Sequence, residues 1–268
     1  MKESVMRANY IECCDNVAGL KDLPDACIDM TVTSPPYDNL RTYNGGTWDE
    51  SGLISEIYRV TKPGGVVVWI VNDATVNGSE TGTSFRQALA FKAAGFNIHD
   101  TMIWKKKGLS FPETVRYYPN FEYMFIFSKG RPKAVHLIAD KENKYAGIKV
   151  HGTDRLPDGS TRAIDSVKNN RNRKVKRLGV RFNVWEVTEE KCNKTGHPAV
   201  FPEKLAIDHI ISWSNPGDVV LDPFIGSGTT AVACLKTGRQ YIGFDISAEY
   251  CQLAARRIAA AEKKGETV

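Results

Sequence analysis

The chain has 268 residues, a formal net charge of +5, 42% hydrophobic and 25% charged residues, which is typical of one large globular domain or of a domain with an inserted part. No apolar stretch is long enough to cross a bilayer, and residues 1–7 lack the apolar core of a secretory signal. The six cysteines show no C-x-x-C spacing, which argues against a zinc site or a disulfide framework, so we expect a cytoplasmic protein with no metal and no membrane partner.

Short apolar runs alternate with helical patterns along most of the chain. The predicted strands are Tyr10–Cys13, Ile28–Thr33, Val66–Val71, Ile98–Trp104, Tyr123–Phe127, Val219–Leu221 and Tyr241–Phe244. The predicted helices are Ser51–Val60, Ser84–Ala94, Glu203–Trp213, Thr229–Lys236 and Ser247–Glu262, and Lys62–Gly65 is predicted to be a turn between a helix and a strand. This alternation predicts an α/β fold with a doubly wound, mostly parallel, seven-stranded Rossmann-like sheet. Such folds bind ligands beyond the carboxyl ends of their strands.

The alternation stops at an insertion, residues 129–195, which separates residues 1–128 from residues 196–268. Within it, the run from Arg162 to Arg181 holds a single acidic residue, Asp165, and eight basic ones: Arg162, Lys168, Arg171, Arg173, Lys174, Lys176, Arg177 and Arg181. A run of this kind is often only a solvated loop. Here three asparagines lie among the cations and no apolar stripe accompanies them, so the segment is predicted to bind nucleic acid rather than a membrane.

Ser34-Pro35-Pro36-Tyr37 follows the second predicted strand directly. Two prolines fix φ and remove two backbone donors, so a stiff loop must follow the strand. Its carbonyl and hydroxyl oxygens can accept hydrogen bonds from a planar amine while the tyrosine ring stacks on the amine's π system. In isolation, a Pro-Pro turn with a surface tyrosine is the simpler interpretation.

A second motif lies far downstream, where the predicted strand Val219–Leu221 runs into Asp222-Pro223-Phe224-Ile225-Gly226-Ser227-Gly228-Thr229. The glycines allow a sharp turn and a close backbone approach to a ligand, and the next helix offers free N–H groups. A tight turn without a ligand would also explain a lone Gly-x-Gly. However, Asp245 ends the following strand, where a carboxylate can accept hydrogen bonds from ribose hydroxyls.

Together, in this order, the two motifs resemble those of the S-adenosylmethionine-dependent DNA amino-methyltransferases. In that family D/N/S-P-P-Y is the catalytic motif and F-x-G-x-G is the cofactor motif. A catalytic motif that precedes the cofactor motif, with an insert between them, is similar to the permuted β arrangement. Further matches are Thr61–Gly65, Ile103–Lys106 and His197–Pro202, and the resemblance spans about residues 10–128 and 182–262.

The resemblance implies roles for individual residues. The catalytic residues would be Ser34, Pro35, Pro36 and Tyr37. The cofactor-binding residues would be Asp15, Thr33, His197, Pro198, Phe201, Asp222, Pro223, Phe224, Gly226, Ser227, Gly228, Thr229 and Asp245. Among them, Asp222 would meet the amino-acid end of the cofactor, Asp245 the ribose and Asp15 the adenine amine. A solvated turn aspartate would also explain Asp15, and a structural cap would also explain His197.

The implied reaction is direct transfer of a methyl group to the exocyclic amine of a base extruded from double-stranded DNA. Serine as the first letter of the catalytic motif favours N4 of cytosine, and N6 of adenine is the alternative. RNA and protein glutamine are weaker candidate substrates. Glutamine methyltransferases place the cofactor motif first, whereas composition alone does not distinguish RNA from DNA. Double-stranded DNA is the expected partner; a cognate restriction endonuclease and a homodimer are open hypotheses.

Overall fold

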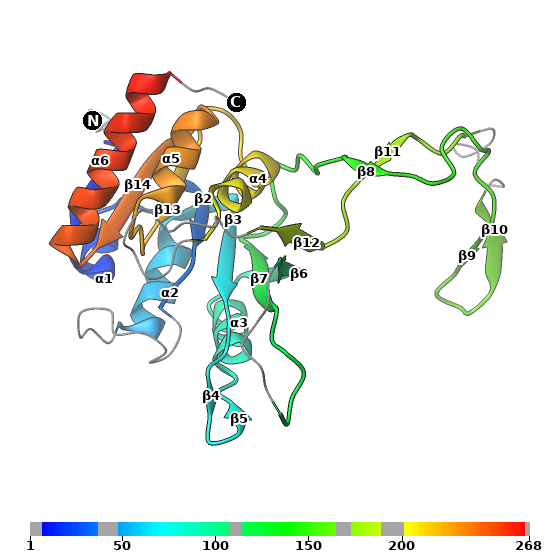
Figure 1. Ribbon diagram of the computed structural model, residues 1–268, viewed down its shortest axis with the longest axis horizontal. Helices are drawn as coiled ribbons and strands as arrows, with labels where there is room; N and C mark the ends of the chain where they lie inside the picture. Colours follow the sequence, from blue (N-terminus) through cyan, green and yellow to red (C-terminus); the bar gives the residue numbers. More distant parts are fainter. Residues whose placement is uncertain (1–6, 37–47, 108–113, 165–172, 189–200, 266–268) are drawn as a thin grey trace. The chain divides into compact units, whose positions relative to one another are not determined.

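An eight-stranded sheet forms the centre of the fold, with strand order β1-β14-β13-β2-β3-β7-β6-β12 (Figure 1). Its strands are β1 (Tyr10–Cys13), β2 (Ile28–Thr33), β3 (Thr61–Val71), β6 (Asn97–Lys106), β7 (Phe121–Ser128), β12 (Val184–Val187), β13 (Val219–Asp222) and β14 (Gln240–Asp245). Neighbouring strands are parallel except for β7, which is antiparallel to both β3 and β6. All seven predicted strands are present, and β12 adds an eighth from within the predicted insertion.

The computed structural model describes residues 7–36, 48–107, 114–164, 173–188 and 201–265. The chain divides into two compact units, Leu137–Phe182 and the remainder. The smaller unit is shorter than the predicted insertion 129–195 because both flanks of that insertion belong to the larger unit. On one flank Lys129 exchanges backbone hydrogen bonds with Gly64 and Gly65. On the other, Trp185 of β12 stacks on His209 with ring centroids 4.6 Å apart.

The six helices of the described residues cover the sheet in two sets of three, as expected for a doubly wound fold (Figure 1). One set is α1 (Asn16–Lys21), α2 (Glu50–Val60) and α3 (Thr83–Ala93), and the other is α4 (Glu203–Trp213), α5 (Thr229–Lys236) and α6 (Ala248–Lys264). The sequence prediction missed α1, which has six residues and too little length to show a hydrophobic period. Asp15, Asp49 and Ser247 cap α1, α2 and α6 by accepting from backbone N–H groups three residues later. No helix in the described part of the chain combines the length and the apolarity that spanning a membrane requires.

The predicted turn Lys62–Gly65 lies instead inside β3, which begins at Thr61. The pairing of β3 with β2 shifts register between Ile28 and Met30, and Gly64 has a φ of +84°. The segment is therefore an irregular start of the strand rather than a turn before it, and its glycine supplies the left-handed conformation that a bulge of this kind needs.

Short strands complete both units. In the larger unit, β4 (Thr75–Val76) and β5 (Ser79–Glu80) form a hairpin after β3. In the smaller unit, β8 (Lys141–Glu142) pairs with β11 (Leu178–Gly179), and β9 (Thr153–Arg155) pairs with β10 (Thr161–Ala163), both antiparallel. Backbone hydrogen bonds from Asn143, Gly147 and Val150 to the chain at Arg173–Arg177 extend the β8–β11 pair into a longer two-stranded ribbon.

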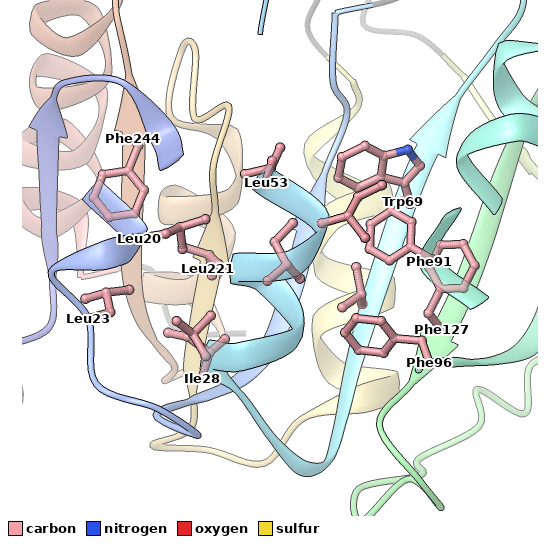
Figure 2. Close-up of a cluster of buried hydrophobic side chains, with 14 of the residues drawn as sticks. Leu20, Leu23, Ile28, Leu53, Trp69, Phe91, Phe96, Phe127, Leu221 and Phe244 are labelled. Atoms are coloured by element: carbon pink, nitrogen blue, oxygen red, sulfur yellow. The ribbon is translucent and has the colours of Figure 1, made fainter. Parts of the chain in front are cut away.

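The hydrophobic core under α1, α2 and α3 is rich in aromatic side chains (Figure 2). Trp69, Phe91, Phe127 and Phe244 are fully buried. Phe91 of α3 stacks on Phe127 of β7, with centroids 4.3 Å apart and planes 9° from parallel. This contact fixes α3 against the antiparallel end of the sheet, whereas Phe244 packs near Leu20 of α1 at the other end (Figure 2).

We expect Phe91→Ala to lower the free energy of unfolding by about 3–5 kcal/mol, because it leaves a cavity among ordered rings. Leu89→Ala is the matched control, since Leu89 lies on the same helix and is 63% exposed; it should change stability by less than about 0.5 kcal/mol. Urea denaturation followed by circular dichroism measures both, and equal losses would contradict the core assignment.

Candidate active site

The two sequence motifs meet at one edge of the sheet. β2 and β13 are parallel neighbours, with Met30 opposite Val220 and Thr31 opposite Leu221, so their carboxyl ends lie side by side. Thr33 Oγ1 donates a hydrogen bond of 2.6 Å to Asp222 Oδ1, although the two residues are 189 positions apart in the sequence. Ser34, which follows Thr33, therefore lies next to the Gly-rich turn that follows Asp222.

The Asp222 carboxylate connects three elements. Besides the bond from Thr33, Oδ1 accepts from the backbone N–H of Phe224 at 3.1 Å, and Oδ2 accepts from Thr230 Oγ1 of α5 at 2.6 Å. The residue is 1% exposed. Burial raises the pKa of Asp222 to about 6, and the hydrogen bonds oppose that rise by favouring the ionised form. The geometry gives Asp222 a positioning role; the predicted contact with the amino-acid end of a cofactor stays a prediction.

The turn after β13 has a backbone shape that requires glycine. Ile225 N–H donates to Phe244 O, and Gly228 N–H donates to Ile225 O. Gly228 has a φ of +81°, and a Cβ there would lie 2.9 Å from Ala254 Cβ and 3.1 Å from Ala254 Cα. Gly228 is also the N-cap of α5 and makes no side-chain cap. The turn thus presents the N-terminus of a helix, which favours an anionic group.

Asp245 lies at the end of β14, beside this turn. Oδ2 accepts from Gly226 N–H at 3.0 Å, and Oδ1 accepts from Ser247 N–H at 2.8 Å. Burial raises the pKa of this carboxyl, whereas the two backbone donors lower it. A carboxylate has about four acceptor positions, so each oxygen retains capacity for a hydroxyl. The two backbone donors hold the carboxylate in one orientation, as a site for a diol requires.

Arg257 of α6 supports the turn from the side of that helix, and no sequence motif pointed to this residue. Its Nη1 donates to Ser227 O at 2.7 Å, to Ser227 Oγ at 2.8 Å and to Thr229 Oγ1 at 3.2 Å. Ser227 and Thr229 are 4% exposed, and their hydroxyls contact Arg257, so these side chains stabilise the turn. Their predicted contact with a cofactor stays a prediction.

An aromatic group lies beside the turn on the side of β2. The half-buried Phe224 ring packs edge-on against Trp48 at 5.3 Å and against Trp69 at 6.5 Å. Trp69 is opposite Thr33 in the sheet and donates from Nε1 to Gln87 Oε1 at 2.8 Å. Trp48 was not predicted, because a lone tryptophan outside a periodic pattern gives no signal of its place in the fold.

The loop after β1 also reaches the turn. Asp15 is exposed, and its Oδ1 accepts from Ala18 N–H at 2.9 Å as the cap of α1, so the structural explanation of Asp15 is sufficient and its contact with adenine stays a prediction. The neighbouring Asn16 is buried and donates from Nδ2 to Pro223 O at 3.3 Å. Asn16 Oδ1 is buried with no hydrogen-bond partner among the described residues, so it is available to accept from an amine.

The remaining predicted site residues are distributed as follows. Ser34 and Pro36 are half-buried and Pro35 is buried at the end of β2, and Phe201 is half-buried just before α4. Tyr37, His197, Pro198, Lys168 and Arg171 lie outside the described residues. The other predicted DNA-binding residues lie in the smaller unit: Arg162, Arg173, Lys174, Lys176 and Arg177 are exposed, whereas Arg181 forms a bidentate ion pair with Asp140 at 2.6–2.9 Å.

These groups fit S-adenosylmethionine. The helix N-terminus of α5 suits a carboxylate, Asp245 suits a ribose, and Asn16 Oδ1 suits an amine, all at one sheet edge beside Ser34. No cluster of three or more His, Cys, Asp or Glu side chains suited to a metal ion occurs within the described ranges.

Comparison with known proteins identifies the family of the chain. The family model described as DNA methylase (N6 and N4 methyltransferases) matches residues 28–256. The orphan methyltransferase M.BamHII of Bacillus amyloliquefaciens is 53% identical over 246 residues, covering 89% of this chain and 91% of the relative. The DNA adenine methyltransferase YhdJ of Escherichia coli is 27% identical, covering 91% and 80%. The structure of the cytosine-N4-specific PvuII DNA methyltransferase is similar in fold, with a TM-score of 0.64 at 18% identity over 97% of this chain and 93% of that one.

The buried Asp222 should make stability depend on pH. Its folded pKa of about 6 lies above the ordinary value of 3.8, so ionisation penalises folding. The penalty is absent below about pH 4 and complete above about pH 6, and stability falls as pH rises between them, by up to about 3 kcal/mol.

Asp222→Asn abolishes this titration. The unfolding free energy of the variant relative to the parent should therefore rise by up to about 3 kcal/mol between pH 4 and 7, whatever constant loss the substitution causes. Urea denaturation at several pH values measures this difference in unfolding free energy. Glu12→Gln is the control, because Glu12 is an exposed residue of β1. Parallel pH profiles for Asp222→Asn and the parent protein would show that Asp222 does not titrate in this window.

Proposed function

Because the chain belongs to the family of N6 and N4 DNA methylases, we propose that it is a site-specific methyltransferase that uses S-adenosylmethionine to methylate N4 of cytosine in double-stranded DNA. The observation that carries the proposal is the bond between Thr33 and Asp222. It places the Ser34-Pro35-Pro36 segment, which can hold an amine, directly beside the Gly226–Gly228 turn, which can hold the methyl donor.

When bound, S-adenosylmethionine supplies a methyl group on a positively charged sulfonium. The chain's own task is to present a weakly nucleophilic amine to it in line. Ser34 Oγ and the Pro35 carbonyl would accept the two N–H bonds of the extruded base, and Tyr37 would stack on its ring. Catalysis of this kind rests on orientation and on electrostatic stabilisation of the charge that develops on nitrogen, with no covalent intermediate.

The choice of cytosine rests on Ser34. In this family serine is usual in enzymes that methylate cytosine N4, whereas aspartate is more usual for adenine N6. A hydroxyl can donate as well as accept, so it is compatible with cytosine, where the ring nitrogen beside the amine is an acceptor; adenine N1 is an acceptor too, so the preference rests on the motif letter alone. The relatives divide on this point, since YhdJ is named an adenine methyltransferase and the PvuII enzyme is described as cytosine-N4-specific. Adenine N6 is therefore the alternative.

The experiment that tests the proposal is sequencing of genomic DNA after expression in a host without DNA modification. N4-methylcytosine at one recurring sequence is the expected result. N6-methyladenine would keep the reaction and change the base. Absence of any methylated base, together with failure of the purified protein to bind S-adenosylmethionine, would refute the enzyme assignment. Competition of RNA against duplex DNA in a labelled-methyl assay tests the RNA alternative.

We further propose that the smaller unit recognises the target sequence. One strand of its ribbon, Arg173–Arg177, carries four exposed cations, Arg173, Lys174, Lys176 and Arg177. A two-stranded antiparallel ribbon fits the major groove of B-DNA, where each base pair presents a distinct pattern of donors and acceptors. Arg181 is a weaker candidate because Asp140 already neutralises it. M.BamHII is named an orphan methyltransferase, so its name does not support a restriction endonuclease as a partner.

Two substitutions should separate base binding from cofactor binding. Tyr37→Ala should slow methyl transfer at least about tenfold through loss of stacking, with the affinity for S-adenosylmethionine unchanged. Asp245→Ala should weaken that affinity about tenfold or more, because a charged acceptor is lost. Isothermal titration calorimetry and single-turnover assays measure the two effects, and exposed Glu249 supplies the control Glu249→Ala. A weaker cofactor affinity in Tyr37→Ala would contradict the assigned roles.

Replacing the four ribbon cations by glutamine should reduce the slope of log Kd for DNA against log salt by up to about 4, since each phosphate contact contributes about 0.9. A matched control removes four exposed cations from helices of the larger unit: Lys21, Lys92, Arg256 and Lys263. Fluorescence anisotropy between low and moderate salt measures the slope. If both quadruple variants change it equally, the ribbon has no special role in DNA binding.

A further inference from the structure

A short segment before β7, Val115–Asn120, lies at the same edge of the sheet as Ser34. β7 runs antiparallel to β3 and β6, so its first residues lie where β3 and β6 end: Tyr123 pairs with Val71, and Phe121 pairs with Lys105. β2 and β3 are parallel, with Thr33 opposite Trp69. The ends of β2 and β6 are three strand spacings apart, about 14 Å, so the segment is a near neighbour of the candidate active site.

This segment is attached to the rest of the larger unit at three points. Arg116 Nη1 donates to Thr75 Oγ1 of the β4–β5 hairpin at 2.8 Å. The Asn120 carbonyl accepts from Lys106 N–H at 2.7 Å, and the Phe121 carbonyl accepts from Asn72 Nδ2 at 3.3 Å. Figure 1 shows the hairpin and the chain leading into β7 beside each other beyond the end of β3. The segment is thus held through its backbone at the end that enters β7 and through the Arg116 side chain near its start.

Between these attachments the side chains face solvent. Tyr117 is 101% exposed, Val115 is 83% exposed and Tyr118 is 54% exposed. A fully exposed tyrosine contributes nothing to the core, but it offers a flat aromatic surface for a ligand. Because the segment is attached on both sides of this residue, little conformational entropy is lost when a ligand binds. Two adjacent aromatic rings next to an arginine are suited to stacking on bases and pairing with phosphates.

The charge around the segment has the sign that DNA requires. Lys105, Lys106 and Lys107 precede the segment, and Arg116 lies within it. Glu186 pairs with Lys105 and Lys107, and Glu122 pairs with Lys106. Arg116, by contrast, donates to the neutral hydroxyl of Thr75, so that contact does not neutralise its positive charge. Lys105 and Lys107 share one carboxylate, so that group also keeps a net positive charge, and Arg116 is the cation within the segment itself that would attract a phosphate.

We infer that Arg116, Tyr117 and Tyr118 form a second DNA-contacting surface, separate from the ribbon of the smaller unit, that holds the strand next to the extruded base. Arg116 contacts a backbone phosphate and Tyr117 stacks on an exposed base. This inference rests on the proposed function, because only an enzyme that extrudes a base leaves neighbouring bases open to stacking. An exposed aromatic patch could also bind a second copy of this chain. The positive charge of Arg116, which the Thr75 hydroxyl does not neutralise, favours a polyanion instead.

The test compares Tyr117→Ala with Tyr117→Phe. Anisotropy measures the affinity for a fluorescein-labelled duplex that contains the methylation site, and a second duplex with 2-aminopurine at the target position reports base extrusion by its fluorescence. Tyr117→Ala should weaken DNA binding about tenfold and reduce the 2-aminopurine signal. Tyr117→Phe should retain both, because it keeps the ring. The affinity for S-adenosylmethionine should be unchanged in both variants, which also shows that they are folded.

Arg116→Gln should lower the salt slope of DNA binding by about 1, whereas Arg256→Gln, an exposed arginine on α6, should leave it unchanged. If the parent protein methylates DNA and Tyr117→Ala binds and extrudes the base equally well, the inference is wrong and the proposed function stands. If Tyr117→Ala changes the oligomeric state in light scattering without changing DNA affinity, the surface binds a second copy instead. If the parent protein does not methylate DNA, the proposed function itself fails.

Discussion

The Asp222 carboxylate accepts hydrogen bonds from Thr33 at the end of β2, from the backbone of Phe224 after β13, and from Thr230 in α5. Two of these bonds are 2.6 Å long and the group is buried, so the three elements are held closely together. The position of Ser34 relative to the Gly226–Gly228 turn therefore depends on one buried side chain. The chain itself cannot hold the two motifs together, because Thr33 and Asp222 are 189 positions apart in the sequence.

The strand order explains why such a connection is needed. From β13 the chain continues through α5 to β14 on one side of the sheet, and from β2 it continues through α2 to β3 on the other side. β13 and β2 are thus the two central strands at which the direction of winding reverses, where doubly wound folds leave a crevice. Parallel hydrogen bonds align the two strands, but they do not fix the loops beyond them. Asp222 fixes these loops.

Most of the larger unit could be predicted from the sequence because its elements carry strong local signals. Buried strands such as Val66–Val71 are continuous apolar runs, and α6 has a clear helical period. β12 could not be predicted, since four residues within a polar segment become a strand only by pairing with β6. α1 is too short for a period, and the bulge at Gly64 resembles an ordinary turn at the level of residue type. In each case tertiary pairing decided the outcome.

The site shows the same division. The places of Gly228 in a turn and of Asp245 at a strand end were predictable, because a Gly-x-Gly turn and the end of an apolar run are visible in the sequence. Arg257, Trp48 and Asn16 were not, because each acts across elements that only the fold brings together. The role of Asp222 could be guessed only in part: a strand-end carboxylate next to a glycine turn suggests a ligand contact, yet its 1% exposure and three donors assign its oxygens to the protein itself.

The burial of Asp222 also has an energetic consequence for how the site is maintained. A carboxylate that is more costly to ionise inside the fold than in water lowers stability at neutral pH, and proteins retain such groups mainly where they position other residues. Here the loss is localised at the junction of the catalytic and cofactor motifs. A ligand that binds only the folded turn adds stability by mass action, so occupancy of the site would offset the loss at the point where it arises. The junction between the two motifs is then least stable without a bound ligand and most stable when a ligand is bound.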